Sequence, residues 1–328
     1  MYNENTTFNQ ILNDPALTEI APYLVGNCPI PDLDMTLAAM QKARPSWIAK
    51  SIADGAEYTS QTAKGGKCRL IDFYTAEEKE QSQSKKYAKL IFMQGKKDMP
   101  FVVICAGGYF TSLCHFKESL PPAAAFNKLG YNCFILNYRL AVPFPKPIDD
   151  LAAAVKYILA NSDGLGVDKD SYAVMGFSAG GYIAAAFGTN ELGAPKYDLP
   201  KPACVMGGYP LLELKVDNMD PAMMNKLAAL LLGHNWTQAD LDKYSLMDKF
   251  GADYPAFYLW HCKDDKIVPF RYAEQAADTM AENGVKHIFR PVENGGHGIG
   301  LGEYSAAKGW EHEAAKLWEE SRQRGYCF

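Results

Sequence analysis

Gly176-Phe177-Ser178-Ala179-Gly180 lies between an apolar run at 171–175 and a small, helix-prone stretch at 181–187. This order predicts a strand, a sharp turn and a helix. At such a turn the serine hydroxyl is exposed, and glycines two residues to either side let the strand and the helix pass without Cβ clashes. Ser178 is therefore a candidate nucleophile. The alternative interpretation is a serine in a purely structural turn.

Around this segment, apolar strand-like runs alternate with helix-like stretches. Strands are predicted at 101–106, 132–138, 172–176, 204–209, 256–261 and 287–292, and helices at 121–129, 147–161, 180–189, 272–283 and 303–324. Two further strands, 67–75 and 87–93, precede them and are separated by a charged turn at 76–86. Such alternation requires crossover connections, which predicts an α/β fold with a mostly parallel sheet and helices on both faces. Catalytic loops should then gather at the carboxyl edge of the strands.

Two segments fall outside this alternation. Residues 1–60 have helix-like spacing of apolar residues, and we predict an N-terminal helical extension that could contribute to a cap over the site. Residues 61–328 would form the catalytic domain. Within it, an insert at about 211–250 is rich in Met and Leu, which is typical of ordinary core, although its place between two strands suggests part of a substrate cap.

The composition excludes several classes of function. A net charge of −5 over 328 residues, without a stripe dense in Lys and Arg, argues against nucleic-acid or anionic-membrane partners and favours a small-molecule substrate. The eight cysteines show no C-x-x-C or metal-ligand spacing and are predicted to be mostly reduced core residues. The chain shows neither a signal-peptide pattern nor a run of about 18 apolar residues, so we expect no membrane span and a cytoplasmic location, with secretion and homo-oligomer formation left open.

Acyl transfer by a serine needs a base, a carboxylate that orients the base, and donors for the developing oxyanion. His297 follows the strand 287–292 in a glycine-rich loop and is the candidate base, against the alternative of a solvated loop histidine. The rivals for this role are the other five histidines: His115, His234, His261, His287 and His312. The candidate acid is Asp265 or its neighbour Asp264, just beyond the strand 256–261. The candidate oxyanion donors are the backbone N–H groups of Gly107, Gly108 and Ala179, and the bland interpretation of the two glycines is a strand-to-loop turn.

Taken in order, these pieces resemble an α/β-hydrolase of the esterase/lipase group related to hormone-sensitive lipase and acetyl xylan esterases. The resemblance covers about residues 65–320 and rests on the Gly107-Gly108 loop, the segment 137–150, the segment 176–180, Asp265 with Val268-Pro269, and Gly296-His297-Gly298. The resemblance selects Asp265 rather than Asp264, because the spacing from Asp265 to Val268-Pro269 matches the family pattern. In that family the oxyanion loop usually reads His-Gly-Gly-Gly, whereas Cys105-Ala106 occupy its first two places here.

The resemblance implies a serine carboxylesterase that acts on short acyl, including acetyl, esters of small molecules or saccharides, without a metal or organic cofactor. Alternatives on the same catalytic core are a serine peptidase, a lipase, or an inert small-molecule-binding homologue. Walls of the acyl or alcohol pocket are expected from five aromatic residues: Tyr109, Phe110, Phe177, Tyr209 and Trp236.

Overall fold

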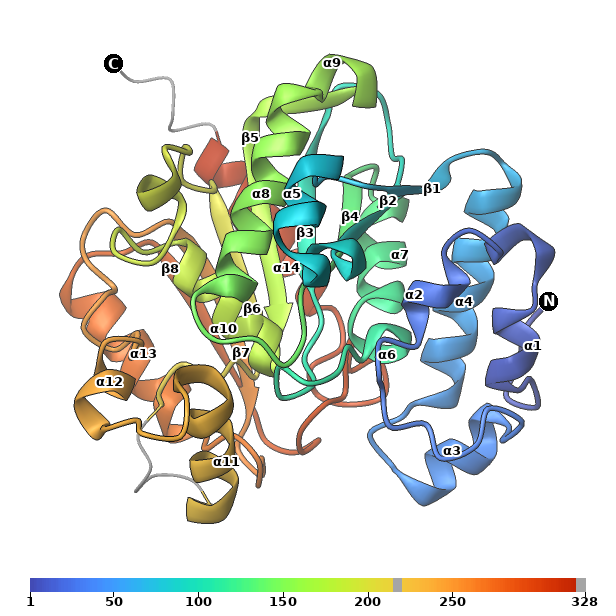
Figure 1. The fold of residues 1–328 in the computed structure, drawn as a ribbon. Coiled ribbons are helices and arrows are strands. Elements are labelled where there is room, and N and C mark those ends of the chain that lie inside the picture. Colours follow the sequence, from blue (N-terminus) through green and yellow to red (C-terminus); the bar gives the residue numbers. More distant parts are fainter. Residues whose placement is uncertain (215–219, 323–328) are drawn as a thin grey trace.

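A central eight-stranded sheet organises the chain in a computed structural model, which describes residues 1–214 and 220–322 (Figure 1). The strand order is β1-β2-β4-β3-β5-β6-β7-β8, and β2 alone runs antiparallel to its neighbours within this sheet. The strands are β1 (Cys68–Ile71), β2 (Lys89–Met93), β3 (Met99–Cys105), β4 (Asn132–Asn137), β5 (Val167–Phe177), β6 (Cys204–Gly208), β7 (Ala256–Cys262) and β8 (His287–Val292). The predicted α/β fold with a mostly parallel sheet is confirmed.

Helices cover both faces of the sheet. One face carries α8 (Lys146–Ala160), α10 (Ser178–Phe187) and α13 (Arg271–Glu282), and the other carries α4 (Ala49–Lys64), α7 (Leu120–Lys128) and α14 (Trp310–Arg322). The shorter elements are α1 (Phe8–Leu12), η1 (Pro15–Leu17), α2 (Ala21–Leu24), α3 (Leu37–Ala43), α5 (Ala76–Gln81), η2 (Gln83–Tyr87), α6 (His115–Glu118), α9 (Ser162–Leu165), η3 (Ala194–Tyr197), α11 (Pro221–Leu232) and α12 (Gln238–Asp242). Among the described residues, no helix is both long and apolar enough to cross a membrane.

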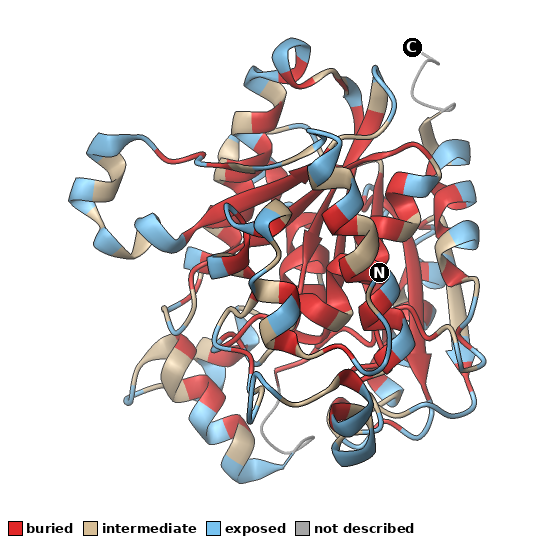
Figure 2. Ribbon diagram, turned by 90° about the vertical axis from the view of Figure 1, so that its right-hand side faces the viewer, coloured by how far each residue is buried: buried red, intermediate tan, exposed pale blue. Residues whose placement is uncertain are grey.

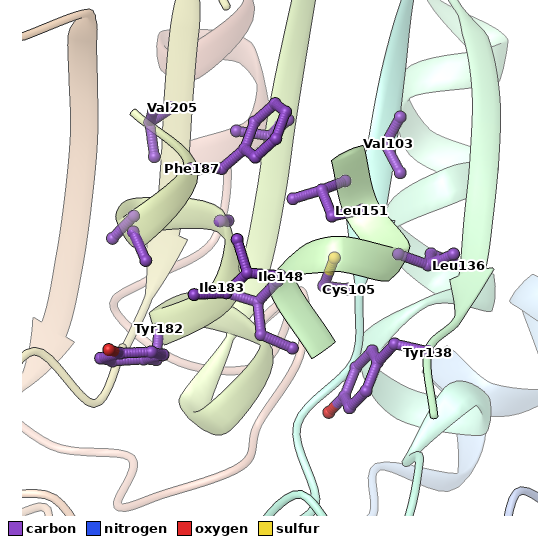
Figure 3. Packing of buried hydrophobic residues seen from close by; sticks show 14 of the residues in the cluster. Val103, Cys105, Leu136, Tyr138, Ile148, Leu151, Tyr182, Ile183, Phe187 and Val205 are labelled. Atoms are coloured by element: carbon purple, nitrogen blue, oxygen red, sulfur yellow. The ribbon is translucent and has the colours of Figure 1, made fainter. Parts of the chain in front are cut away.

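The inner strands β2, β4, β6 and β7 are buried on both faces, as the red ribbons in the middle of Figure 2 show, whereas the edge strands β1 and β8 are partly exposed. Side chains from α8 and α10, among them Ile148, Leu151 and Ile183, point toward strand residues such as Val103 in one apolar cluster (Figure 3). Because parallel strands with covered faces have no polar side, their sequences are continuously apolar rather than alternating. This core fixes the carboxyl edge on which the site lies.

The N-terminal helices α1 to α4 lie together at one side of the molecule, on the right of Figure 1. The ring of Phe8 contacts Trp47 and Phe116 at centroid distances of 5.9 and 5.1 Å, so the start of the chain packs onto α6. At the opposite side, α11 and α12 occupy the region of the predicted insert. Residues 215–219 of that insert, and the predicted continuation of the last helix to 324, lie outside the described residues.

Several predicted boundaries differ from the structure: the strand predicted at 67–75 ends at Ile71, the strand predicted at 172–176 begins at Val167, and two other differences have a clear local cause. The charged stretch 76–86, expected to be a turn, contains α5, because the Thr75 hydroxyl and the Glu78 carboxylate cap each other's backbone N–H groups. The last helix begins at Trp310 rather than at residue 303, since Gly302 and Gly309 adopt positive φ angles of 61° and 84° that a continuous helix does not allow.

Candidate active site

The turn between β5 and α10 places Ser178 at the carboxyl edge of the sheet. Its backbone is left-handed, with a φ of 53°. A Cβ on Gly176 would lie 2.1 Å from the Gly180 carbonyl oxygen, and a Cβ on Gly180 would lie 2.2 Å from the Cys105 carbonyl oxygen. Both positions therefore require glycine, and the serine between them is held on a strained turn.

Three side chains that are distant in sequence meet at this turn. The Ser178 Oγ lies 2.9 Å from His297 Nε2, and His297 Nδ1 lies 2.7 Å from Asp265 Oδ2. Asp265 follows β7 and His297 follows β8, so both come from loops at the same edge as Ser178. The ionised carboxylate can only accept, so in the neutral imidazole Nδ1 carries the proton and Nε2 is free to accept the serine hydroxyl proton.

The Asp265 carboxylate is held by further donors. Its Oδ1 accepts from the backbone N–H groups of Ile267 (2.8 Å) and Val268 (3.0 Å), and its Oδ2 lies 3.0 Å from His261 Nε2. That nitrogen also lies 3.0 Å from the Val268 carbonyl oxygen, which can only accept, so His261 Nε2 carries a proton. Burial by itself would raise the pKa of Asp265, but the hydrogen bonds with His261 and His297 outweigh it and hold the pKa below its usual value.

The neighbouring Asp264 has a different position. Its two carboxylate oxygens accept from the N–H groups of Gly295 (3.2 Å) and Gly296 (2.8 Å), so it anchors the loop that carries His297. The structure therefore brings Asp265, not Asp264, to the imidazole. Among the rival histidines, His261 contacts Asp265 from behind, and His115 is buried between Ser119 and Asn137.

One of the three predicted oxyanion donors is already occupied. The Gly107 N–H donates to the buried Glu118 Oε2 at 2.8 Å, which is a correction to its predicted role. The N–H groups of Gly108 and Ala179 have no hydrogen-bond acceptor among residues 1–214 and 220–322, so both remain available beside Ser178. The thiol of Cys105 is fully buried, and this burial raises its pKa, which disfavours a thiolate nucleophile.

A small apolar pocket opens beside the Ser178 hydroxyl. It has a free volume of about 10 Å³, roughly the minimum that admits one water molecule. The described residues that line it are Tyr109, Phe110, Ser178, Ala179, Leu211, Met223, Leu227, Ile267 and Val268. Met223 and Leu227 belong to α11, so the region of the predicted insert forms part of the wall.

Three of the five aromatic residues predicted as pocket walls lie elsewhere, while Tyr109 and Phe110 line the pocket. Phe177 and Tyr209 are fully buried behind the site because they sit at the ends of β5 and β6, where the core covers them. Trp236 packs against the main core cluster and is absent from the described lining. Instead of lining the pocket, the Tyr209 ring contacts the His297 ring at a centroid distance of 4.8 Å.

Sequence reasoning missed Glu118 and the anchoring contacts of Asp264 and His261. The only signal for Glu118 is a charged pair, Lys117-Glu118, in a stretch that otherwise has no Asp, Glu, Lys or Arg and follows the Gly107-Gly108 loop. Among the described residues, no group of three or more His, Cys, Asp or Glu side chains is arranged to hold a metal ion.

Comparison with known proteins identifies relatives along most of the chain. Endo-1,4-beta-xylanase B of Butyrivibrio fibrisolvens is 27% identical over 235 residues, which are 68% of this chain and 36% of the relative. Esterase LipC of Mycobacterium tuberculosis is 30% identical over 239 residues, which are 65% of this chain and 58% of LipC. The chain thus spans less than two thirds of either relative.

A solved structure has the same fold. The acetyl ester-xyloside bifunctional hydrolase from Caldicellulosiruptor lactoaceticus superposes with a TM-score of 0.66 and 24% identity, over 76% of this chain and 95% of the other. The BD-FAE family model matches residues 90–280, which is more than half of the chain and includes β3, the serine turn and Asp265. The chain therefore belongs to the BD-FAE family of α/β-hydrolases.

Proposed function

We propose that this protein is a serine carboxylesterase that hydrolyses short-chain acyl esters, including acetyl esters, of small molecules or saccharides. The observation that carries the proposal is the unbroken hydrogen-bonded series from Ser178 Oγ through His297 to Asp265, with distances of 2.9 and 2.7 Å. This series supplies a nucleophile, a base and an orienting carboxylate in the geometry that acyl transfer needs.

In the acylation half of the reaction, Ser178 Oγ attacks the ester carbonyl carbon while His297 Nε2 takes the hydroxyl proton. The carbonyl oxygen becomes an oxyanion, and the free N–H groups of Gly108 and Ala179 are the donors best placed to bind it. The carbon–oxygen bond to the alcohol then breaks, and His297 returns the proton to the departing alkoxide. Asp265 stays ionised throughout and stabilises the imidazolium.

Deacylation repeats these steps with water. His297 takes a proton from a water molecule, whose oxygen attacks the acyl-enzyme carbonyl and forms a second oxyanion. Collapse of this intermediate releases the carboxylic acid, and the imidazolium returns its proton to Ser178 Oγ. Neither half of the cycle changes an oxidation state.

The pocket beside Ser178 supports a short acyl group. A free volume of about 10 Å³ accommodates little more than a methyl group, and its lining is almost entirely apolar. Longer chains would have to displace packed side chains, at a cost of about 1–3 kcal/mol. The names of the curated relatives, an esterase and a xylanase, point in the same direction and suggest acetylated saccharides as a class to test.

The test is hydrolysis of p-nitrophenyl acetate by the wild type and by Ser178→Ala. We expect turnover to vanish in this variant and to persist in Ser162→Ala, a control serine that is similarly buried, 5% exposed against 9% for Ser178. Full turnover by Ser178→Ala would show that the nucleophile is wrong. A fluorophosphonate should label the wild type at Ser178, whereas an inert homologue would resist labelling. A screen of acylated sugars and aryl esters then defines the alcohol portion.

A further inference from the structure

The short helix α6 carries a buried carboxylate that the reaction above does not use. Glu118 is 2% exposed and lies between the Gly107-Gly108 loop and the end of β6. Its Oε2 accepts the Gly107 N–H at 2.8 Å, and its Oε1 accepts the Tyr209 hydroxyl at 3.0 Å. Burying a carboxylate is costly unless it is paired or hydrogen-bonded, and these two bonds, together with Lys117 Nζ at 4.0 Å from Oε1, stabilise it there.

Tyr209 links Glu118 to the loop that carries His297. Its hydroxyl oxygen accepts the Gly300 N–H at 2.9 Å, while its ring lies against the His297 ring. The Tyr209 hydroxyl has a single proton, which it donates to Glu118, so the direction of each bond in the series is fixed. Glu118 is thereby connected, through Tyr209, to the loop that carries His297.

The preceding residue on α6 holds the same loop. Lys117 Nζ donates to the Gly298 carbonyl oxygen at 2.9 Å. A Cβ on Gly298 would lie 2.5 Å from Lys117 Nζ, and one on Gly300 would lie 2.1 Å from the Lys117 carbonyl oxygen. The glycines beyond His297 therefore let the loop pack directly onto α6, which explains the glycine-rich sequence there better than a turn alone.

The contacts of α6 also orient the Gly108 N–H. The Gly107 carbonyl oxygen accepts the Cys114 N–H at 3.0 Å, and in a trans peptide the following N–H points to the opposite side. The Gly108 N–H is thus directed away from Cys114, and Glu118 fixes the peptide plane just before it. Glu118 thus holds the peptide that precedes Gly107, and Cys114, the residue before α6, holds the peptide between Gly107 and Gly108.

We propose that Glu118 is a positioning residue, which holds the Gly107-Gly108 loop and, through Tyr209, the His297 loop at the separation that the transition state requires. This inference rests on the serine esterase function proposed above. Loss of the Glu118 carboxylate should impair the chemical step more than substrate binding, because Glu118 does not line the pocket.

Two substitutions at this position and one at its partner test the proposal. Glu118→Gln keeps the size, but an amide cannot accept both bonds, and Glu118→Ala removes both. We expect kcat for p-nitrophenyl acetate to fall about tenfold in Glu118→Gln and about a hundredfold in Glu118→Ala, with KM within about threefold of wild type. Tyr209→Phe should resemble Glu118→Gln, because loss of the hydroxyl breaks its bonds with Glu118 and Gly300 but leaves the bond between Gly107 and Glu118 in place.

A second tyrosine–glutamate pair, in which the glutamate is exposed, serves as a control away from the site. The Tyr131 hydroxyl donates to Glu319 Oε1 at 3.0 Å, the same distance as in the Tyr209–Glu118 pair, on helix α14. Glu319→Gln should leave kcat within about twofold of wild type. Rates are expressed per active site, counted by end-point fluorophosphonate labelling, and thermal unfolding confirms that each variant is folded.

The outcomes separate the two proposals. If the wild type hydrolyses no ester, the proposed function is wrong. If the wild type is active and the folded Glu118 variants retain wild-type kcat per labelled site, or change only KM, the positioning role is wrong. If Glu118→Ala does not fold, Glu118→Gln and Tyr209→Phe decide by the same criterion.

Discussion

Replacing Met223 by alanine should widen the acyl preference of the proposed esterase. Met223 lines the pocket of about 10 Å³ beside Ser178, is only partly buried, and lies near the start of α11. Truncation to alanine would remove the side-chain atoms beyond Cβ, and the space that they vacate is enough for two methylene groups. At about 0.8 kcal/mol per buried methylene, a butyryl chain would gain about 1.6 kcal/mol relative to acetyl. Since 1.36 kcal/mol corresponds to a factor of ten, the butyrate-to-acetate ratio of kcat/KM should rise about 15-fold.

The assay compares kcat/KM for p-nitrophenyl acetate, propionate and butyrate in the wild type and in Met223→Ala. Met223→Leu, which nearly conserves volume, serves as the control and should leave the ratio within about threefold of wild type. A folded, active Met223→Ala protein with an unchanged ratio would refute the assignment of this cavity to the acyl group. A parallel loss of rate on all three esters would refute it as well.

Three further predictions concern Asp265 and the two neighbouring thiols of Cys28 and Cys114. Asp265→Asn should lower kcat by about 10³–10⁴-fold with little change in KM, because the amide no longer favours the His297 tautomer that accepts the Ser178 proton; steady-state kinetics measure this. Because the pKa of Asp265 is lowered in the folded state, its contribution to the free energy of unfolding is complete above about pH 4 and is lost as the pH falls toward the folded pKa. The difference in melting temperature between the wild type and Asp265→Asn should therefore shrink only below about pH 4. A difference that is already lost at pH 6 would contradict this. The Sγ atoms of Cys28 and Cys114 lie 3.4 Å apart, so incubation with oxidised glutathione should convert the two thiols into one disulfide and release two molecules of reduced glutathione; mass spectrometry should detect the bridge in the wild type and not in Cys28→Ser.

The meeting of Ser178, His297 and Asp265 could be predicted because its signals are local. The glycines at 176 and 180 report a close approach of two backbone segments, and the glycine-rich loop around His297 follows the strand β8 directly. The order of serine, acid and base along the chain then matched a known family. In each of these cases a short sequence carries the physical constraint itself, so no long-range information was needed.

What could not be predicted depends on contacts between distant segments. Glu118 looks like any charged residue on a short helix, and only the fold shows that Gly107 and Tyr209 converge on it. The pairing of Cys28 with Cys114 is invisible for the same reason, because the N-terminal segment had no predicted place against α6. The prediction that Phe177 and Tyr209 line the pocket was wrong for a related reason. An aromatic residue at the end of a strand can face either the pocket or the core, and the sequence does not distinguish the two sides.

The left-handed backbone at Ser178 limits which nucleophiles this scaffold can carry. A φ of 53° suits residues with an unbranched Cβ poorly and a β-branched residue far less, since its second γ substituent crowds the backbone. Cysteine could replace the serine with the same backbone, whereas threonine could not do so without opening the turn. Attempts to convert this fold into a threonine-dependent acyltransferase would therefore have to rebuild the elbow before changing the chemistry.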